Sequence, residues 1–201
     1  MIDDTVNDRL RLCRLLVLDF DGVMTDNKVL VHDDGRESVT CNRADGMGLR
    51  YLRTLSDVKV LILSSEVNSV GRARAAKLGI DYIYAGEQKL GGLLREIGRL
   101  GVGPERVCYV GNDINDLECM KAVGLAVAVA DSAAEVLTCA DHVTSRNGGD
   151  GAIREVCDMM LRSRGALAGQ EEKPLSQTVA SHSCPPAPLS LPEAEIEQSR
   201  D

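Results

Sequence analysis

The sequence has few aromatic residues: its 201 residues include four Tyr, one Phe and no Trp. Proteins often hold single-stranded nucleic acids by stacking bases on aromatic rings, and Trp and Tyr often anchor partner interfaces, so neither kind of surface is expected. An excess of positive charge is also missing, because 31 acidic residues face 23 Lys and Arg and the net charge is −8. Broad binding to nucleic acid is therefore not expected.

Long apolar runs and paired cysteines are absent as well. No stretch approaches the roughly 20 apolar residues that span a bilayer. The first residues, MIDDTVNDRLRLCR, lack the apolar core of a secretory signal. The seven cysteines are scattered and form no CxxC pair, which favours reduced thiols over a disulfide framework or a zinc site. These features predict a cytoplasmic protein without membrane contacts.

Proline is scarce in most of the chain and frequent at its end: five of the six prolines follow residue 170. Residues 165–201 carry six acidic and two basic residues and show little apolar periodicity. Such a segment buries too little surface to offset its conformational entropy, so we expect a disordered acidic tail. The rest is expected to comprise an N-terminal extension, residues 1–12, and one folded domain, residues 13–164.

Short apolar runs rich in Val, Ile and Leu recur along the predicted domain. They do not alternate with polar residues, which is typical of parallel strands buried on both faces. The runs are Leu15–Leu18, Val58–Leu63, Tyr82–Tyr84, Val107–Val110 and Leu125–Val129. Between them, apolar residues follow helical spacing, as in Leu90, Leu93, Leu94, Ile97 and Leu100. The pattern predicts a doubly wound α/β domain with a mostly parallel sheet, whose chemistry gathers at the carboxyl ends of the strands.

One segment interrupts this alternation directly after the first predicted strand. Residues Lys28–His32 and Glu37–Cys41 flank Asp33-Asp34-Gly35, and two strand-like runs around Asp-Gly predict a β-hairpin. The hairpin is expected to form a flap over the active site or an oligomer contact. A simple surface hairpin is the alternative.

Polar side chains follow the predicted strand ends. Asp19 and Asp21 stand two residues apart after the first strand, where a divalent cation would relieve their repulsion; carboxylate oxygens suit Mg²⁺. Ser64 ends the second run, where its hydroxyl and nearby backbone N–H groups can bind an anion. Lys89 supplies a positive charge that can neutralise a phosphate. Gly111-Asn112-Asp113-Ile114-Asn115-Asp116 adds further oxygens. Each of these four motifs is common by itself. Because they follow four successive apolar runs in order, their joint occurrence by chance is improbable.

These segments resemble a known set of motifs. DFDGVMTDN, LILSS, Lys89 and GNDINDLECM are similar to the four motifs of the haloacid dehalogenase superfamily of phosphatases. The short insert, CNRADGMGL and GGDGAIREVC resemble its capless subgroup. That subgroup holds phosphatases for 3-deoxy-D-manno-octulosonate (Kdo) 8-phosphate and nonulosonate 9-phosphates, and a domain type fused behind acylneuraminate cytidylyltransferases. The resemblance covers about residues 13–162 and implies a Rossmann-like core without a cap domain.

The resemblance implies roles for individual residues. Asp19 is the nucleophile that forms an aspartyl-phosphate, and Asp21 is the general acid and base. Ser64 and Lys89 hold the phosphoryl group. Mg²⁺ is the implied cofactor, with Asp19, Asp21 (through its carbonyl), Asn112 and Asp113 as metal residues. The family usually has Asp where Asn112 stands, so the site carries one charge less, although Asp113 and Asp116 lie near enough in sequence to restore it.

The resemblance also bears on the substrate, a small sugar-acid phosphate. Ser65-Glu66 stands where members acting on Kdo 8-phosphate tend to have Gly-Arg, and Glu66 with Lys77 resembles the enzymes for nine-carbon sugars. We therefore expect a nonulosonate (sialic-acid-type) 9-phosphate, with Kdo 8-phosphate as the next candidate. Glu66 as a solvated helix N-terminal acid is the alternative.

Family members form ring-like homotetramers in which the hairpin, here residues 28–41, covers the neighbour's site. Arg43 and Asp45 then line a shared pocket, or else form a surface salt bridge. The competing hypothesis is a weak or inactive oligomerisation domain associated with CMP-sialic acid synthesis, which Asn112 favours. A dinucleotide-binding domain is excluded because DxDG, and not GxGxxG, follows the first strand.

Overall fold

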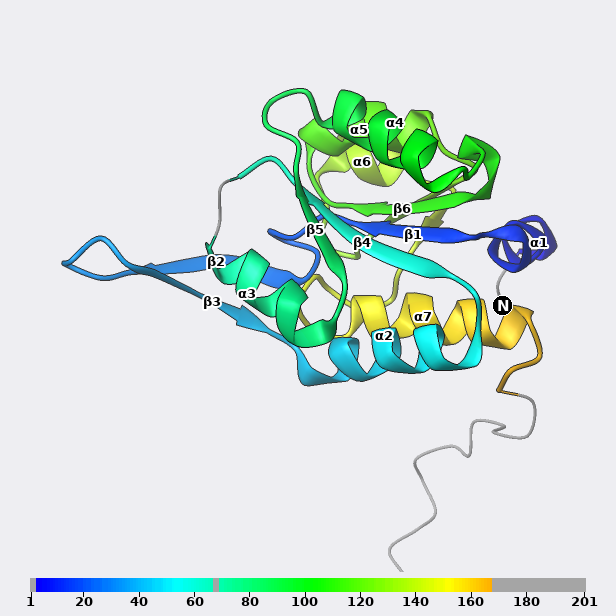
Figure 1. Cartoon of the computed structure of the whole chain (residues 1–201), viewed down its shortest axis with the longest axis horizontal. Coiled ribbons are helices and arrows are strands. Elements are labelled where there is room, and N and C mark those ends of the chain that lie inside the picture. The colour runs from blue at the N-terminus through cyan, green and yellow to red at the C-terminus, as the bar shows by residue number, and fades with distance from the viewer. Residues whose placement is uncertain (1–2, 67–68, 168–201) are drawn as a thin grey trace, which may run out of the picture. The chain divides into compact units, whose positions relative to one another are not determined.

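The computed structural model describes residues 3–66 and 69–167 (Figure 1). Six parallel strands form its main sheet, in the order β5-β4-β1-β6-β7-β8, and two antiparallel strands form a hairpin. The strands are β1 (Leu15–Leu18), β2 (Thr25–Val31), β3 (Glu37–Cys41), β4 (Lys59–Ser64), β5 (Asp81–Tyr84), β6 (Val107–Gly111), β7 (Leu125–Ala128) and β8 (His142–Val143).

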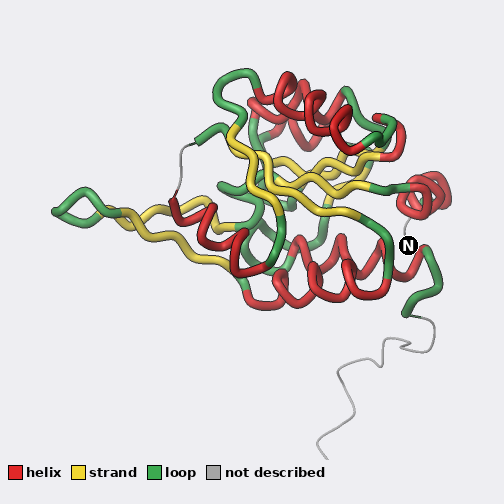
Figure 2. The backbone as a smooth tube through the Cα atoms, viewed as in Figure 1, coloured by secondary structure: helices red, strands yellow, loops and turns green. Residues whose placement is uncertain are grey.

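Helices cover both faces of this sheet, as Figure 2 shows. They are α1 (Asp4–Leu12), α2 (Arg43–Leu55), α3 (Ser69–Leu78), α4 (Lys89–Leu100), α5 (Leu117–Lys121), α6 (Ala134–Cys139) and α7 (Ala152–Ser163), with short 3₁₀ turns η1 (Pro104–Arg106) and η2 (Ile114–Asp116). This is the predicted doubly wound α/β fold. The structure adds β8, which is two residues long and too short to stand out as an apolar run.

The strands have two buried faces, and each face has its own core. In β1, Leu16 and Leu18 pack with α1, α2 and α7, whereas Leu15 and Val17 pack with α4, α5 and α6. Successive side chains of a strand point to opposite faces, so a strand buried on both sides has to be apolar throughout. This explains why the apolar runs do not alternate.

The hairpin β2–β3 leaves the sheet directly after β1 (Figure 1). It begins at Thr25, three residues before the predicted Lys28, and the pairing shifts register between Thr25 and Val29. Asn27 lies in this shift with a left-handed φ of 60°. Val29, Leu30 and Val31 are exposed by 53–63%. No separate cap domain occurs within residues 3–66 and 69–167.

The ends of the predicted domain can be compared with the structure only in part. Residues 4–12, predicted as an extension, form α1, whose Val6 and Leu10 are buried in the core that α7 also joins. The predicted tail lies outside the described residues from position 168 onward. Six of the seven cysteines lie in the described part, all as free thiols. Within that part, no helix is long and apolar enough to cross a membrane.

Candidate active site

Three neighbouring strands carry polar residues to one edge of the sheet. Asp19 follows β1, Ser64 ends β4 and Asn112 follows β6. The pairing aligns Leu18 with Ile62 and with Val110, and the Asp19 backbone N–H continues it by donating to the Val110 carbonyl at 3.0 Å. Because parallel strands end at the same edge, side chains far apart in sequence meet there.

Lys89 joins this group from the first turn of α4. Its ammonium donates to Asp19 Oδ1 at 2.7 Å and to Asp116 Oδ1 at 2.6 Å. Lys89 is 3% exposed, Asp19 5% and Asp116 0%, so the three charges form a buried cluster. One cation between two carboxylates leaves an excess negative charge beside the nearby Asp21.

The buried cluster shifts the pKa values of its members. Burial, and then repulsion from Asp116, raise the pKa of Asp19 to about 7, against the opposing charge of Lys89. Burial by itself would lower the pKa of Lys89, but Asp19 and Asp116 outweigh it and raise that pKa above its ordinary value. Lys89 therefore stays charged, and a further cation would favour the ionised form of Asp19.

Asp21 lies on a tight loop after β1. Gly22 has a left-handed φ of 82°, and its N–H donates to Thr25 Oγ1 at 3.0 Å. The Gly149 N–H donates to the Val23 carbonyl at 3.0 Å, and a Cβ on Gly148 would overlap the Gly22 carbonyl oxygen. Burial, followed by the charge of Glu66, raises the pKa of Asp21. A shift in this direction favours the protonated form that a general acid needs.

Asn112 brings a third oxygen-bearing group to Asp19 and Asp21. One end of its amide lies 3.1 Å from Asp19 Oδ2 and 3.0 Å from the Asp21 carbonyl oxygen. Octahedral Mg²⁺ with bonds of about 2.1 Å places adjacent ligand oxygens about 3.0 Å apart. With its oxygen at this end, Asn112 fits such a site. Among the described residues, no cluster of three His, Cys, Asp or Glu side chains has metal-binding geometry, so a metal here would need the carbonyl and the amide.

Ser64 stands beside this group at the end of β4 and is 1% exposed. Its hydroxyl accepts from the Glu66 backbone N–H at 3.1 Å and donates to the Glu66 carbonyl at 3.4 Å. Tyr82 donates to the same carbonyl at 3.0 Å. The Glu66 carboxylate is exposed and near enough to raise the pKa of Asp21, so Glu66 belongs to this end of the sheet.

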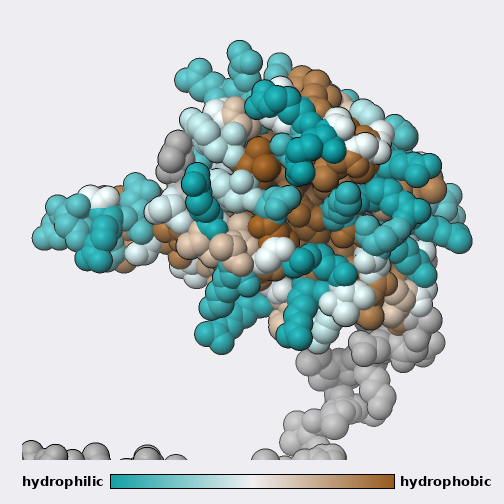
Figure 3. All heavy atoms as spheres, in the orientation of Figure 1, coloured by the Kyte–Doolittle hydropathy of each residue, from teal (hydrophilic) through white to brown (hydrophobic). Residues whose placement is uncertain are grey.

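Two predicted substrate residues lie elsewhere. Arg43 and Lys77 line a groove of about 610 Å³ between α2 and α3. Hydrophilic side chains project in the lower part of Figure 3, where Figure 1, in the same orientation, labels these two helices. We call this groove the basic groove; its charged lining is Arg43, Arg50, Arg53, Arg74 and Lys77, with no carboxylate. Within the described residues, none of these five forms an ion pair. Lys77 lies eight residues after Ser69, or about 12 Å along α3.

Two other predicted residues have structural partners. Asp45 is fully buried, and its Oδ1 accepts from the Arg154 backbone N–H at 2.8 Å, which joins the starts of α2 and α7. Asp113 is exposed and caps η2 by accepting from the Ile114 N–H at 2.7 Å. A substrate role for Asp45 and a metal role for Asp113 stay predictions.

The structure places Asp116 and Tyr109 at the base of the site. From the sequence, Asp116 was expected only as a further charge near the metal, and Tyr109 was not expected to take part. Tyr109 donates its hydroxyl proton to Asp116 Oδ1 at 2.7 Å, and Asp116 Oδ2 accepts from the Asn112 N–H at 2.9 Å. Asp116 thereby positions both Lys89 and Asn112. Its spacing, four residues after Asn112 and next to an apolar helix, was the available signal.

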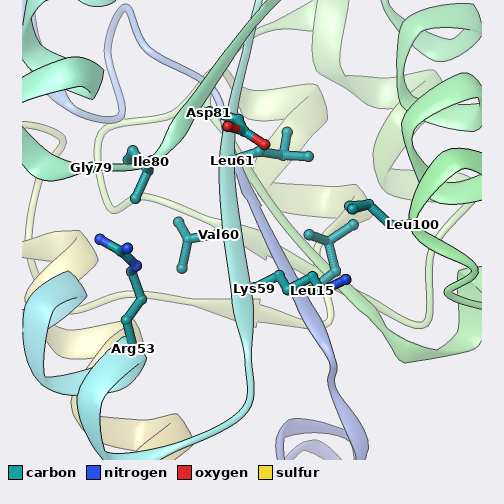
Figure 4. Close-up of a pocket in the computed structure, with 9 residues that line it drawn as sticks. All are labelled: Leu15, Arg53, Lys59, Val60, Leu61, Gly79, Ile80, Asp81 and Leu100. Atoms are coloured by element: carbon teal, nitrogen blue, oxygen red, sulfur yellow. The ribbon is translucent and has the colours of Figure 1, made fainter.

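A second pocket, of about 180 Å³, opens at the opposite end of the sheet (Figure 4). Leu15, Lys59 and Asp81, the first residues of β1, β4 and β5, take part in its lining. Ligands of open α/β sheets bind at the carboxyl ends, so this pocket is not the candidate active site.

An aspartate pair after the first strand, a hydroxyl after the next, and a buried lysine are the parts of a phosphoryl-transfer hydrolase. The comparisons agree: residues 63–156 match the model of haloacid dehalogenase-like hydrolases. The chain is 41% identical over 155 residues to the Kdo 8-phosphate phosphatase of Escherichia coli K12, over 77% of this chain and 82% of the relative.

Solved structures give the same result. The Kdo 8-phosphate phosphatase of Yersinia pestis has a TM-score of 0.79 at 39% identity, over 83% of this chain and 90% of that one. The enzyme of that name from Moraxella catarrhalis, in complex with magnesium, phosphate and Kdo, has a TM-score of 0.78 at 26% identity, over 81% of this chain and 93% of that one. The chain belongs to the haloacid dehalogenase-like hydrolases, among the phosphatases of this family.

Proposed function

We propose that the protein is a Mg²⁺-dependent phosphatase that releases phosphate from a sugar-acid phosphate monoester through an aspartyl-phosphate on Asp19. One observation carries the proposal: the Asp19 carboxylate, the Asp21 carbonyl and the Asn112 amide converge at the spacing of Mg²⁺ ligands, beside the buried Lys89. The magnesium and phosphate in the Moraxella relative support it.

The residues then divide the reaction into two displacements. The Asp19 carboxylate attacks phosphorus, and the bond from phosphorus to the sugar oxygen breaks while Asp21 gives its proton to that oxygen. Asp21, now ionised, takes a proton from water as the water attacks phosphorus and Asp19 leaves. Burial raises the pKa of Asp21, and a shift in this direction favours the protonated form that the first step requires.

The remaining groups stabilise charge. Lys89 and the Ser64 hydroxyl would donate hydrogen bonds to the transferring phosphoryl oxygens. Asp19, the Asp21 carbonyl and Asn112 would hold Mg²⁺, which when bound supplies positive charge against the phosphoryl oxygens. Asp116 keeps Lys89 and the Asn112 backbone in position.

We place a nonulosonate 9-phosphate first among substrates, because Ser65-Glu66 follows Ser64 where Gly-Arg is typical of Kdo 8-phosphate enzymes. The exposed carboxylate of Glu66 lies at this end of the sheet, where a sugar hydroxyl could bind. Kdo 8-phosphate is the second candidate, favoured by the names of the curated relatives.

We propose that Lys77 acts at the active site of a neighbouring protomer and not at its own. The residue lies about 12 Å from the amino end of α3, which follows the Ser64 loop. In a homotetramer, the basic groove of one protomer faces the site of the next and binds the sugar carboxylate. The groove cations, which form no ion pair within the described residues, and the exposed apolar side chains of the hairpin support such an assembly. We place the protein in the cytoplasm.

Phosphate release from a panel of sugar-acid phosphates, with Mg²⁺ and with EDTA, tests the proposal. We expect release only with Mg²⁺, and faster from a nonulosonate 9-phosphate than from Kdo 8-phosphate. A tenfold preference for Kdo 8-phosphate would reverse the order of substrates. No release from any member would favour the assembly module instead, and full activity from a monomer in sedimentation would contradict the shared site.

A further inference from the structure

Asn112 differs chemically at its two amide ends, and one end faces two hydrogen-bond acceptors. These are Asp19 Oδ2 at 3.1 Å and the Asp21 carbonyl oxygen at 3.0 Å. If the NH₂ group occupies this end, it donates to both acceptors. If the amide oxygen occupies it, three oxygens converge, and only a cation between them makes that arrangement favourable.

The surroundings hold the side chain in place while both orientations remain available. The Asn112 N–H donates to Asp116 Oδ2, and its carbonyl accepts from the Ala133 N–H, each at 2.9 Å. The other end of the amide packs on Gly22, where a Cβ would overlap it. A half-turn about the Cβ–Cγ bond exchanges nitrogen and oxygen without moving the backbone.

We propose that Asn112 is a two-state residue, which closes the metal-free site as a hydrogen-bond donor and turns its oxygen inward when Mg²⁺ binds. The inference rests on the proposed function, because it requires that this site takes Mg²⁺. Aspartate cannot fill both roles: its carboxylate has no proton to donate at neutral pH, and it would add a third negative charge beside Asp19 and Asp116.

Two consequences follow for this chain. The metal-free protein keeps the geometry of the Asp19–Gly22 loop, because neutral hydrogen bonds replace the cation. Mg²⁺ binds more weakly than it would to an aspartate, because those hydrogen bonds must break first and the ligand lacks a charge.

The first experiment compares Asn112→Asp with the wild type by thermal unfolding in EDTA and in excess MgCl₂. Without metal we expect the variant to melt about 2–4 °C lower. With MgCl₂ we expect it to gain more stability than the wild type and to bind Mg²⁺ roughly 10-fold tighter in calorimetry. Asn115→Asp is the matched control: it adds the same charge to the same motif, but Asn115 is exposed and bonds only to Ser65 Oγ in the described structure.

A second measurement does not depend on the folding of any variant. In wild-type protein labelled with ¹⁵N, the Asn112 side-chain NH₂, assigned through its own backbone, should exchange with water slowly in EDTA. Excess Mg²⁺ should accelerate this exchange roughly 10-fold or more, because the NH₂ group leaves its two acceptors.

The outcomes separate this inference from the proposed function. If the wild type binds Mg²⁺ but Asn112→Asp melts no lower than the wild type without metal, or no lower than Asn115→Asp, the two-state role is wrong and the function stands. Unchanged NH₂ exchange on addition of Mg²⁺ would also overturn it. If neither protein responds to Mg²⁺, the metal site of the proposed function fails, and the inference fails with it.

Discussion

Two regions of the molecule hold positive side chains in opposite surroundings. Lys89 is 3% exposed and pairs with two carboxylates at 2.6–2.7 Å. The five cations of the basic groove are partly or largely exposed, and two of them, Arg53 and Arg74, donate to the carbonyls of Leu78 and Asn42. A buried charge has lost its hydration and needs partners within its own protomer. A solvated charge is stabilised by water and stays available to bind a ligand. The comparison predicts stability effects at the buried cluster and binding effects at the groove.

The largest expected effect is on turnover at the buried cluster. Asp19→Asn keeps an acceptor for Lys89 but removes the nucleophile, so phosphate release should fall by roughly 10⁴-fold or more. The melting temperature should change little. Asp26→Asn, in β2 just after this loop, is the matched control and should retain most activity. Near-normal rates in Asp19→Asn would disprove the role of Asp19.

The next effect is on stability. Lys89→Met leaves the carboxylates of Asp19 and Asp116 buried without their cation, so the free energy of unfolding should fall by about 3–5 kcal/mol in urea titrations. Lys77→Met, at an exposed lysine of the groove, should change it by about 0.5 kcal/mol or less. If both variants lost a similar free energy of unfolding, the proposed difference between the buried cluster and the basic groove would be wrong.

Neutralising the groove should act on substrate binding. Arg43→Gln with Lys77→Gln should raise KM for a sugar-acid phosphate by roughly 10–100-fold, the range expected for lost charge-assisted hydrogen bonds, with kcat nearly unchanged. Lys59→Gln removes a charge from the pocket at the opposite end of the sheet and serves as the control. An equal rise in KM for Lys59→Gln would indicate only a general charge effect.

The smallest effect concerns His142, a half-buried group whose Nε2 has no hydrogen-bond partner in the described structure. Burial lowers its pKa, with Glu155 opposing. The unfolded chain then binds more protons, so this histidine should lower stability as the pH falls through about 6.5, its unfolded value. His142→Gln should reduce the drop in Tm between about pH 7.5 and 5.5 by a few degrees. Parallel Tm curves for the two proteins would contradict this.

The apolar core was the most predictable part of the structure. The run Leu15–Leu18 is β1 without change. Three other runs differ from their strands by one residue at one end, and Val58–Leu63 is shifted from β4 by one residue at both ends. A strand buried on both faces has to be apolar wherever it lies, so local composition is sufficient to locate it.

Polar residues were harder to place, because their partners are distant in sequence. Asp45 is buried through a hydrogen bond to Arg154, 109 residues away, and Asp116 through Lys89 and Tyr109. No local pattern distinguishes such a buried acid from a solvated one. Lys77 and Glu66 were predicted together from the resemblance to enzymes for nine-carbon sugars. In the structure Lys77 lies about 12 Å along α3 from Ser69 and lines the basic groove.

Gly148 and Gly149 support the active site although they contribute no reacting group. Their backbones fit against the turn of Gly22 and Val23, so any side chain at position 148 would have to push that turn aside. Circular permutants opened between residues 147 and 151 should therefore lose activity before they lose their fold, although every reacting group would still be present.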